Sequence, residues 1–380
     1  MRDLVRTVEE TTPAGRDRSV DALRALAIGG VVLGHWLVSA LVVESGSVRV
    51  ASPLRDMPYL APVSWVLQTM ALFFLVGGQM TARSHASARA RGVGYGRWLR
   101  ARAARLLRPV AAVAVVWTVV AVVMLASGAD FKSVQALAKL VWSPLWFLLV
   151  YAALTALTPL VARLHPAWPL AVVALVDLVR FGWGGPEWVG WVNLAAGWLV
   201  PYCLGAAWAR GRRNERTTGW ALLAGGAAAA AVLIVWAGYP ASMVGVPGAP
   251  ISNQSPPTLA AVAFGLAQCG AALLLRDPLR RVLARPTLWA FVALANLSAM
   301  TIFLWHQTAM IAVTTLGLLA DHPLLGLHTV PDEPSWLLAR LAWLPAFALA
   351  LCVCWGAFHV YERARPPEPR IRTEEAHARS

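Results

Sequence analysis

The chain has 380 residues, of which 58% are hydrophobic and only 14% are charged. A soluble core of this length would not bury so many apolar side chains, so the composition excludes an ordinary soluble domain and favours a membrane protein. The net charge of +14 does not indicate a nucleic-acid partner. The basic residues are not gathered on one soluble module beside groove-reading or aromatic motifs, as such a partner would require.

Apolar stretches of about 20 residues, long enough for a helix to cross a ~30 Å hydrocarbon layer, recur along the chain. They predict an all-α integral membrane protein with about ten transmembrane helices. In chain order, the predicted spans cover residues 20–43, 62–82, 109–127, 144–163, 166–183, 188–209, 219–238, 257–275, 287–320 and 336–361. The ninth stretch is longer than one crossing requires, so we expect it to tilt, bend or extend beyond the bilayer.

Arginine and lysine residues concentrate in alternate inter-span segments. If the N-terminus is cytoplasmic, the inside segments hold 26 of the 33 Lys and Arg residues and the outside segments hold four. This split predicts that both termini are cytoplasmic and that the number of crossings is even, with eight or twelve as alternatives to ten. The expected organisation is a cytoplasmic tail over 1–18, one membrane domain over 19–361 and a cytoplasmic tail over 362–380.

The first predicted span carries Asp21, Arg24 and His35 on one helical face. Arg24 and His35 are 11 residues apart, which places them within about 20° of each other and roughly 16 Å apart along the helix axis. One interpretation pairs Asp21 with Arg24 and gives His35 a structural hydrogen bond. The other makes His35 a general base in a cavity, since imidazole accepts a proton near neutral pH.

The segment over residues 83–108 contains eight Arg residues and no acid. Its last part places Arg102, Arg105 and Arg108 at successive i+3 steps of a helix. One interpretation is a positive-inside segment attracted to anionic lipid. The other is a phosphate clamp at the cytoplasmic mouth, because the guanidinium fork suits phosphate oxygens.

Three further positions bear on the site. His306 lies in the middle of the ninth stretch and suits a structural role as well as a catalytic one. Glu362, at the end of the last span, is expected to cap or pair at the interface. The His and acidic residues of the preceding outside loop match no metal motif, so no metal ion is expected.

Several blocks of the sequence resemble the membrane-bound acyltransferase family 3, whose members transfer acyl groups to sugars, polysaccharides and other hydroxyl-bearing acceptors. The similar blocks occur in the family's order: Asp21-Ala-Leu-Arg24 to Gly34-His35, Phe73-Phe74-Leu-Val-Gly77-Gly78, Arg102-Ala-Ala-Arg105 to Pro109, Leu145-Trp146-Phe147-Leu148, Tyr202-Cys-Leu-Gly205 and Ile302-Phe-Leu-Trp305-His306. One departure is Gly77-Gly78-Gln79, where a Ser-Gly-Phe-like run is expected.

The resemblance implies an O-acyltransferase in the cell membrane that takes acyl-CoA as donor and a sugar, glycan or other small hydroxyl compound as acceptor. Arg102 and Arg105, with Arg108, would hold the donor phosphates. His35 would take the proton from the attacking hydroxyl, and Arg24 would bind donor phosphate or oppose charge on the carbonyl oxygen. Asp21 and His306 are secondary candidates, and a covalent acyl-histidine is an open alternative.

The competing hypothesis is a small-solute or lipid transporter whose path is lined by Arg24, His35 and His306. Ten spans suit both classes. The combination of a base inside the membrane, an Arg row at the cytoplasmic mouth and the ordered blocks favours the acyltransferase.

Overall fold

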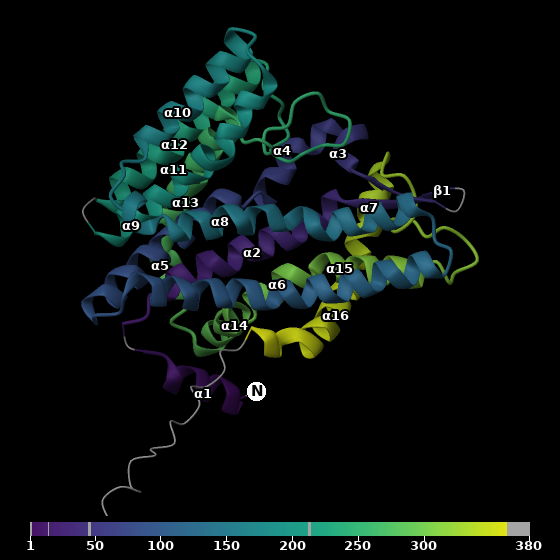
Figure 1. Ribbon diagram of the computed structural model, residues 1–380, viewed down its shortest axis with the longest axis horizontal. Coiled ribbons are helices and arrows are strands. Elements are labelled where there is room, and N and C mark those ends of the chain that lie inside the picture. Colours follow the sequence, from purple (N-terminus) through teal and green to yellow (C-terminus); the bar gives the residue numbers. More distant parts are fainter. Residues whose placement is uncertain (1, 14, 45–46, 212–213, 363–380) are drawn as a thin grey trace, which may run out of the picture.

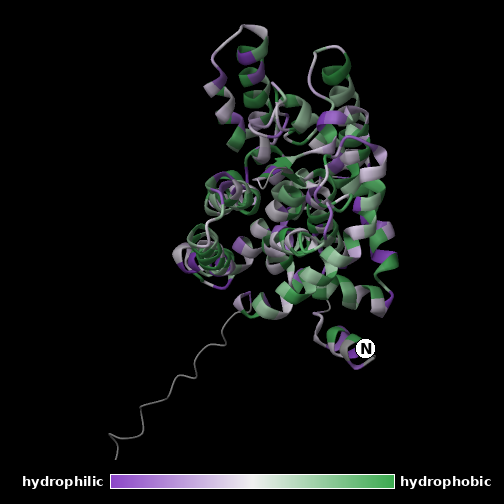
Figure 2. Ribbon diagram, turned by 90° about the vertical axis from the view of Figure 1, so that its right-hand side faces the viewer, coloured by the Kyte–Doolittle hydropathy of each residue, from purple (hydrophilic) through white to green (hydrophobic). Residues whose placement is uncertain are grey.

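Helices make up nearly all of the regular structure in the computed structural model, which describes residues 2–13, 15–44, 47–211 and 214–362. In this described part, nine helical stretches are long and apolar enough to cross a membrane: Arg18–Val38, Pro58–Ala90, Tyr95–Ala126, Phe131–Ala156, Glu187–Ala209, Glu215–Val235, Leu259–Val282, Ala299–Gly317 and Pro334–Tyr361. Hydrophobic residues prevail along these helices (Figure 2). The predicted all-α, polytopic membrane fold is therefore confirmed.

The helices fall into long and short elements. The long ones are α2 (Arg18–Val38), α5 (Met70–Ala90), α6 (Tyr95–Ala126), α11 (Val192–Ala209), α12 (Glu215–Val235), α13 (Leu259–Val282), α15 (Ala299–Gly317) and α16 (Pro334–Phe358). The short ones are α1 (Arg2–Thr11), α3 (Pro53–Asp56), α4 (Ala61–Ser64), α7 (Phe131–Trp142), α8 (Trp146–Ala156), α9 (Thr158–Val161), α10 (Ala167–Asp177) and α14 (Pro286–Leu297). Single 3-10 turns cover Pro58–Leu60, Trp65–Leu67, Ser143–Leu145, Glu187–Trp191 and His359–Tyr361.

Several predicted spans differ from the observed helices. The span expected at 166–183 is α10, which continues as the π-helix Leu178–Gly182 and is shorter than a full crossing. The stretch expected at 287–320 is two helices, α14 and α15, broken at Ser298. Glu362 explains how the break is tolerated, because its carboxylate accepts hydrogen bonds from the N–H groups of Met300 and Thr301. It thus has the capping role expected for it.

A β-hairpin follows the first span. We expected this span to reach residue 43, but α2 ends at Val38, and β1 (Ala40–Glu44) pairs antiparallel with β2 (Ser47–Ala51). The strands are rich in valine, whose branched side chain favours extended backbone. A lone hairpin is only marginally stable. This one is supported by α7 and by the buried ring of Trp336.

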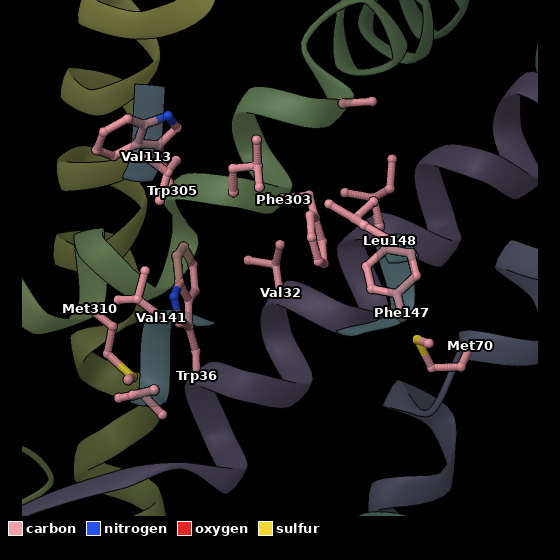
Figure 3. Close-up of a cluster of buried hydrophobic side chains, with 14 of the residues drawn as sticks. Val32, Trp36, Met70, Val113, Val141, Phe147, Leu148, Phe303, Trp305 and Met310 are labelled. Atoms are coloured by element: carbon pink, nitrogen blue, oxygen red, sulfur yellow. The ribbon is translucent and has the colours of Figure 1, made fainter. Parts of the chain in front are cut away.

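The central and peripheral helices differ in burial. Helices α11 and α15 are the most buried of the long helices, whereas α6, α12 and α16 expose most of their apolar surface, as lipid-facing helices do. Helices α10 to α13 lie together at the upper left of Figure 1. The main core forms where α2, α8 and α15 meet. Figure 3 shows Val32 on the side of Phe303 and Phe147, and Trp36 on the side of Met310 and Val141.

Both ends of the described chain lie at one end of the bundle. Helix α1 packs on α14, and Glu362 binds the first turn of α15, which directly follows α14. The described part holds nine full-length candidate spans, against about ten predicted, and α10 is the shorter tenth. Of the predicted tail over 362–380, residues 363–380 lie outside the described residues.

An ion network ties the start of α2 to α13. The Asp17 carboxylate caps α2 and accepts hydrogen bonds from Arg276 at 2.7 Å and Arg280 at 3.2 Å. Burial disfavours the ionised form of Asp17, but hydrogen bonds from Ser19, Arg280 and Arg276 outweigh it and hold the pKa of this carboxyl well below its usual value. The network therefore fixes the N-terminal end of α2 against α13.

Helices α5 and α11 approach each other backbone to backbone. A Cβ atom on Gly78 would collide with the Tyr202 carbonyl, and one on Gly205 would collide with the Leu75 carbonyl. Small residues allow this approach in membrane proteins. The contact joins the Gly77-Gly78 block to the Tyr202–Gly205 block. This close contact explains why position 78 is a glycine. Gly77 similarly leaves room for the Tyr151 ring.

We expect Gly205→Ala to destabilise the protein by about 1–3 kcal/mol, because the added methyl group forces the two helix backbones apart. Thermal unfolding of the purified protein in detergent measures the loss. The control is Gly225→Ala in α12, where an added Cβ meets no atom within 4 Å. Equal melting temperatures for Gly205→Ala and wild type would contradict the close packing.

Candidate functional site: a cavity beside two histidines

A cavity of about 310 Å³ lies at the C-terminal half of α2. Its walls come from α2, α15, the hairpin, the turn before α5, the α7–α8 turn and the loop over residues 244–255. The charge distribution places three of these wall segments outside the membrane. None of the lining residues is Asp, Glu, Lys or Arg, and the polar lining consists of His35 with serine, threonine and glutamine side chains.

His35 faces this cavity. It is only partly buried, and within the described part of the chain no hydrogen bond to its ring is found. The imidazole nitrogens are therefore free to meet a ligand. The candidate base predicted from the first span thus has the access that proton transfer requires.

His306 lies directly against His35. The centroids of the two rings are 5.1 Å apart, and their planes are tilted by 40°. The Nδ1 atom of His306 bonds the Phe303 carbonyl, and since a carbonyl can only accept, Nδ1 carries the proton. The Nε2 atom then has a lone pair, and it is buried without a hydrogen-bond partner in the protein. Two imidazolium ions at this separation would repel, so the pair holds at most one extra proton.

Two glycines of α2 shape the cavity. Thr69 packs so close to Gly30 that a Cβ there would lie 2.6 Å from the threonine side chain, and Leu67 contacts Gly34 in the same way at 3.5 Å. The Thr69 hydroxyl donates to the Ala27 carbonyl at 2.6 Å. The non-helical turn before α5 therefore crosses α2 one turn away from His35 and forms a cavity wall.

Arg24 lies on the same helix, toward the predicted cytoplasmic end. Arg102 of α6 is partly buried and lies within electrostatic range of Arg24, Arg105 and the phenol groups of Tyr151 and Tyr202. The folded chain thus places Arg24 and Arg102 within electrostatic range of each other, although 78 residues separate them in the sequence. Arg105 and Arg108 have exposed side chains on the outer face of α6.

Asp21 does not pair with Arg24, which corrects one of the two interpretations of the first span. Its carboxylate accepts two hydrogen bonds from Arg16, at 2.7 and 3.1 Å, and its backbone carbonyl accepts one from Asn296 at 2.8 Å. The i+3 spacing places Asp21 and Arg24 near each other, but the segment before α2 folds back and supplies a different arginine. Asp21 thus holds the first turn of α2 in place, and it does not line the cavity.

Arg340 of α16 is a site residue that we did not predict. It is fully buried and donates hydrogen bonds to the carbonyls of Trp36, Ser39 and Gly326 at 2.7 to 2.8 Å. Two of these carbonyls flank the end of α2, where a cation is favourable. The indole of Trp36 in turn donates to the His306 carbonyl at 2.9 Å. This set of contacts holds the His35 turn against α15.

Gln307 is the second residue that sequence analysis missed. It lines the cavity directly after His306 in the chain. The sequence did offer one signal for Arg340 and Gln307: each is a polar side chain within an apolar span.

As for metals, no group of three His, Cys, Asp or Glu side chains that could hold an ion is found among the described residues. In the outside loop, His328 instead bonds the Thr314 carbonyl at 2.8 Å.

We expect Arg340→Met to lower the melting temperature, because three buried carbonyls lose their donor and each unsatisfied group costs about 1–3 kcal/mol. Arg281→Met, at an exposed position on α13, is the control and should melt like wild type. Thermal unfolding in detergent measures both. A wild-type melting temperature for Arg340→Met would show that the guanidinium does not hold the end of α2.

Comparison with known proteins adds an independent observation. A family model described as an acyltransferase domain, Acyl_transf_3, matches residues 17–359. No curated protein and no solved structure gives a significant match. The match begins at the cap of α2, ends in the last turn after α16, and includes both histidines, Arg24 and the α6 arginines. With nearly the whole chain matched, this multi-pass membrane protein belongs to acyltransferase family 3 and is an acyltransferase.

Proposed function

We propose that the protein is an O-acyltransferase of the cell membrane that moves a short acyl group, such as acetyl, from acyl-CoA to a hydroxyl of a sugar, glycan or similar small molecule. The observation that carries this proposal is the layout of α2. Its His35 end opens into an uncharged cavity, and Arg24, toward its other end, lies within electrostatic range of Arg102.

This layout suits a donor with separate charged and reactive ends. The phosphates of acyl-CoA are anions that arginine binds well. They are joined to the thioester by the long, uncharged pantetheine arm. Arg24, Arg102 and Arg105 would hold the phosphates at the cytoplasmic end, while the arm would place the thioester near His35. Arg108, which is exposed and lies furthest along α6 from Arg102, would contribute less to phosphate binding.

The acceptor would enter from the other side. The cavity walls formed by the hairpin and by the loop over 244–255 belong to segments that the charge distribution places outside. Without a charged lining residue, the cavity suits a neutral acceptor, because a charged one would be desolvated without a counter-charge.

The chemistry then follows from the His35 imidazole. Its neutral nitrogen takes the proton from the acceptor hydroxyl as that oxygen attacks the thioester carbonyl carbon. The tetrahedral intermediate collapses, the C–S bond breaks, and the proton passes from His35 to the departing thiolate sulfur. The products are the ester and free CoA. His306 would support the protonated state of His35 through its Nε2 lone pair.

We expect His35→Ala to reduce acyl transfer by about 10²–10⁴-fold, the usual contribution of a general base. Membranes containing the protein are incubated with labelled acetyl-CoA, and label is followed into lipid, glycan and small-molecule fractions. The control is His359→Ala, which replaces a partly exposed histidine that stacks on Trp355 and does not line the cavity. Transfer that survives in His35→Ala at more than a tenth of the wild-type rate would rule out the assigned base.

A second prediction concerns the donor. Arg102→Gln should raise the KM for acyl-CoA about 10–100-fold, since a charge-assisted hydrogen bond contributes about 1.5–3 kcal/mol. The KM for the acceptor should stay within about twofold. Arg100→Gln, at an exposed position on the same helix, is the matched control. An unchanged donor KM in Arg102→Gln would favour the lipid-attracting interpretation of the α6 arginines.

A further inference from the structure

Gln307 carries an unsatisfied carboxamide into the cavity. Its side chain is 1% exposed, and both its Nε2 and its Oε1 atom lack a hydrogen-bond partner in the protein. Gln307 and Phe303 lie one helical turn apart on α15 and both line the cavity that His35 faces. Gln307 therefore borders the same chamber as the proposed base, with its buried carboxamide unpaired.

An unpaired amide in this position is costly. Burying a carboxamide without compensating hydrogen bonds is unfavourable, because the group gives up its hydrogen bonds to water and gains none in the protein. A leucine or methionine of similar size would fill the site without that cost. The polar group is therefore best explained by a partner that enters the cavity and supplies both a donor and an acceptor.

We propose that Gln307 binds the acceptor, donating from Nε2 to one of its oxygens and accepting at Oε1 from a neighbouring hydroxyl. This inference rests on the proposed acyltransferase function. It assigns the acceptor a chemical class, a neutral compound with at least two adjacent hydroxyls, and it assigns a residue to recognise it. One hydroxyl of the pair would be held by Gln307 while the other loses its proton to His35.

The cavity supports this class in two ways. Its lining has no charged side chain but several hydroxyl and amide groups, among them Ser39, Ser52, Thr69 and Gln254, which suit a polyol. Its volume of about 310 Å³ is at the lower end for small-molecule sites and fits one sugar-sized ring. A longer glycan would place only its reacting unit there.

The test compares two kinds of acceptor with labelled acetyl-CoA as donor. Methyl glucoside and glycerol offer adjacent hydroxyls, whereas 1-propanol offers one. In Gln307→Met, the KM for the two polyols should rise about 10-fold, since two neutral hydrogen bonds contribute about 1–3 kcal/mol. The KM for acetyl-CoA and the kinetics with 1-propanol should not change. Gln307→Glu, which keeps the shape but loses the N–H donors, should shift the polyol KM in the same direction.

The matched control is Gln79→Met. Gln79 is equally buried, its Nε2 also lacks a partner, and it does not line the cavity. Its replacement should leave the polyol KM unchanged. Melting temperatures of all variants separate misfolding from lost recognition, and Gln307→Glu provides the second measurement if Gln307→Met does not fold.

Three outcomes would overturn the inference. An unchanged polyol KM in both Gln307 variants shows that the carboxamide does not touch the acceptor. An equal loss of turnover with polyols, 1-propanol and water places Gln307 at the thioester oxygen instead. Absence of transfer by the wild-type protein to every acceptor overturns the proposed function itself, and the inference with it.

Discussion

The end of α2 is the point on which the rest of the site depends. A helix leaves its last carbonyls without partners, and inside a membrane no water satisfies them. Arg340 supplies the missing donors to Trp36 and Ser39, and the Trp36 indole reaches the His306 carbonyl. The Arg340 guanidinium is thus buried among carbonyl oxygens, and within the described part of the chain it has no acidic partner. The same contacts that satisfy the helix end hold His35 against His306 at the cavity wall.

Close helix packing forms the other half of the frame. Hydrophobic burial gives little drive for association between helices already in lipid, so small residues and polar contacts must provide it. Gly78 and Gly205 let α5 and α11 touch through their backbones, and Gly30 lets Thr69 cross α2. The glycine contacts between α5 and α11 set the distance between these two helices. The contact of Thr69 with Gly30 places the turn before α5 as a wall of the cavity. The exposed apolar faces of α6, α12 and α16 then need only match the lipid.

The two ends of α2 meet different chemistry. The end with Arg24 carries positive charge and lies within electrostatic range of Arg102, whereas the end with His35 opens into a cavity without charged side chains. Electrostatic attraction between arginine and phosphate is strong at an interface, and a neutral polar cavity discriminates by hydrogen bonds. In the proposed function, this single helix would separate binding of an anionic donor from recognition of a neutral acceptor and would join them through one imidazole.

The sequence by itself determined the membrane fold, most helix positions and the shared face of Arg24 and His35, because hydropathy and the 3.6-residue period are local properties. It also singled out His306. It did not determine that His306 contacts His35, that Asp21 pairs with Arg16, or that α2 ends before a hairpin. Those facts join residues far apart in the chain or depend on competing partners. Likewise, Arg340 and Gln307 acquire their roles only once α2, α15 and α16 pack together, because only then does the structure decide which buried polar groups find partners and which face a cavity.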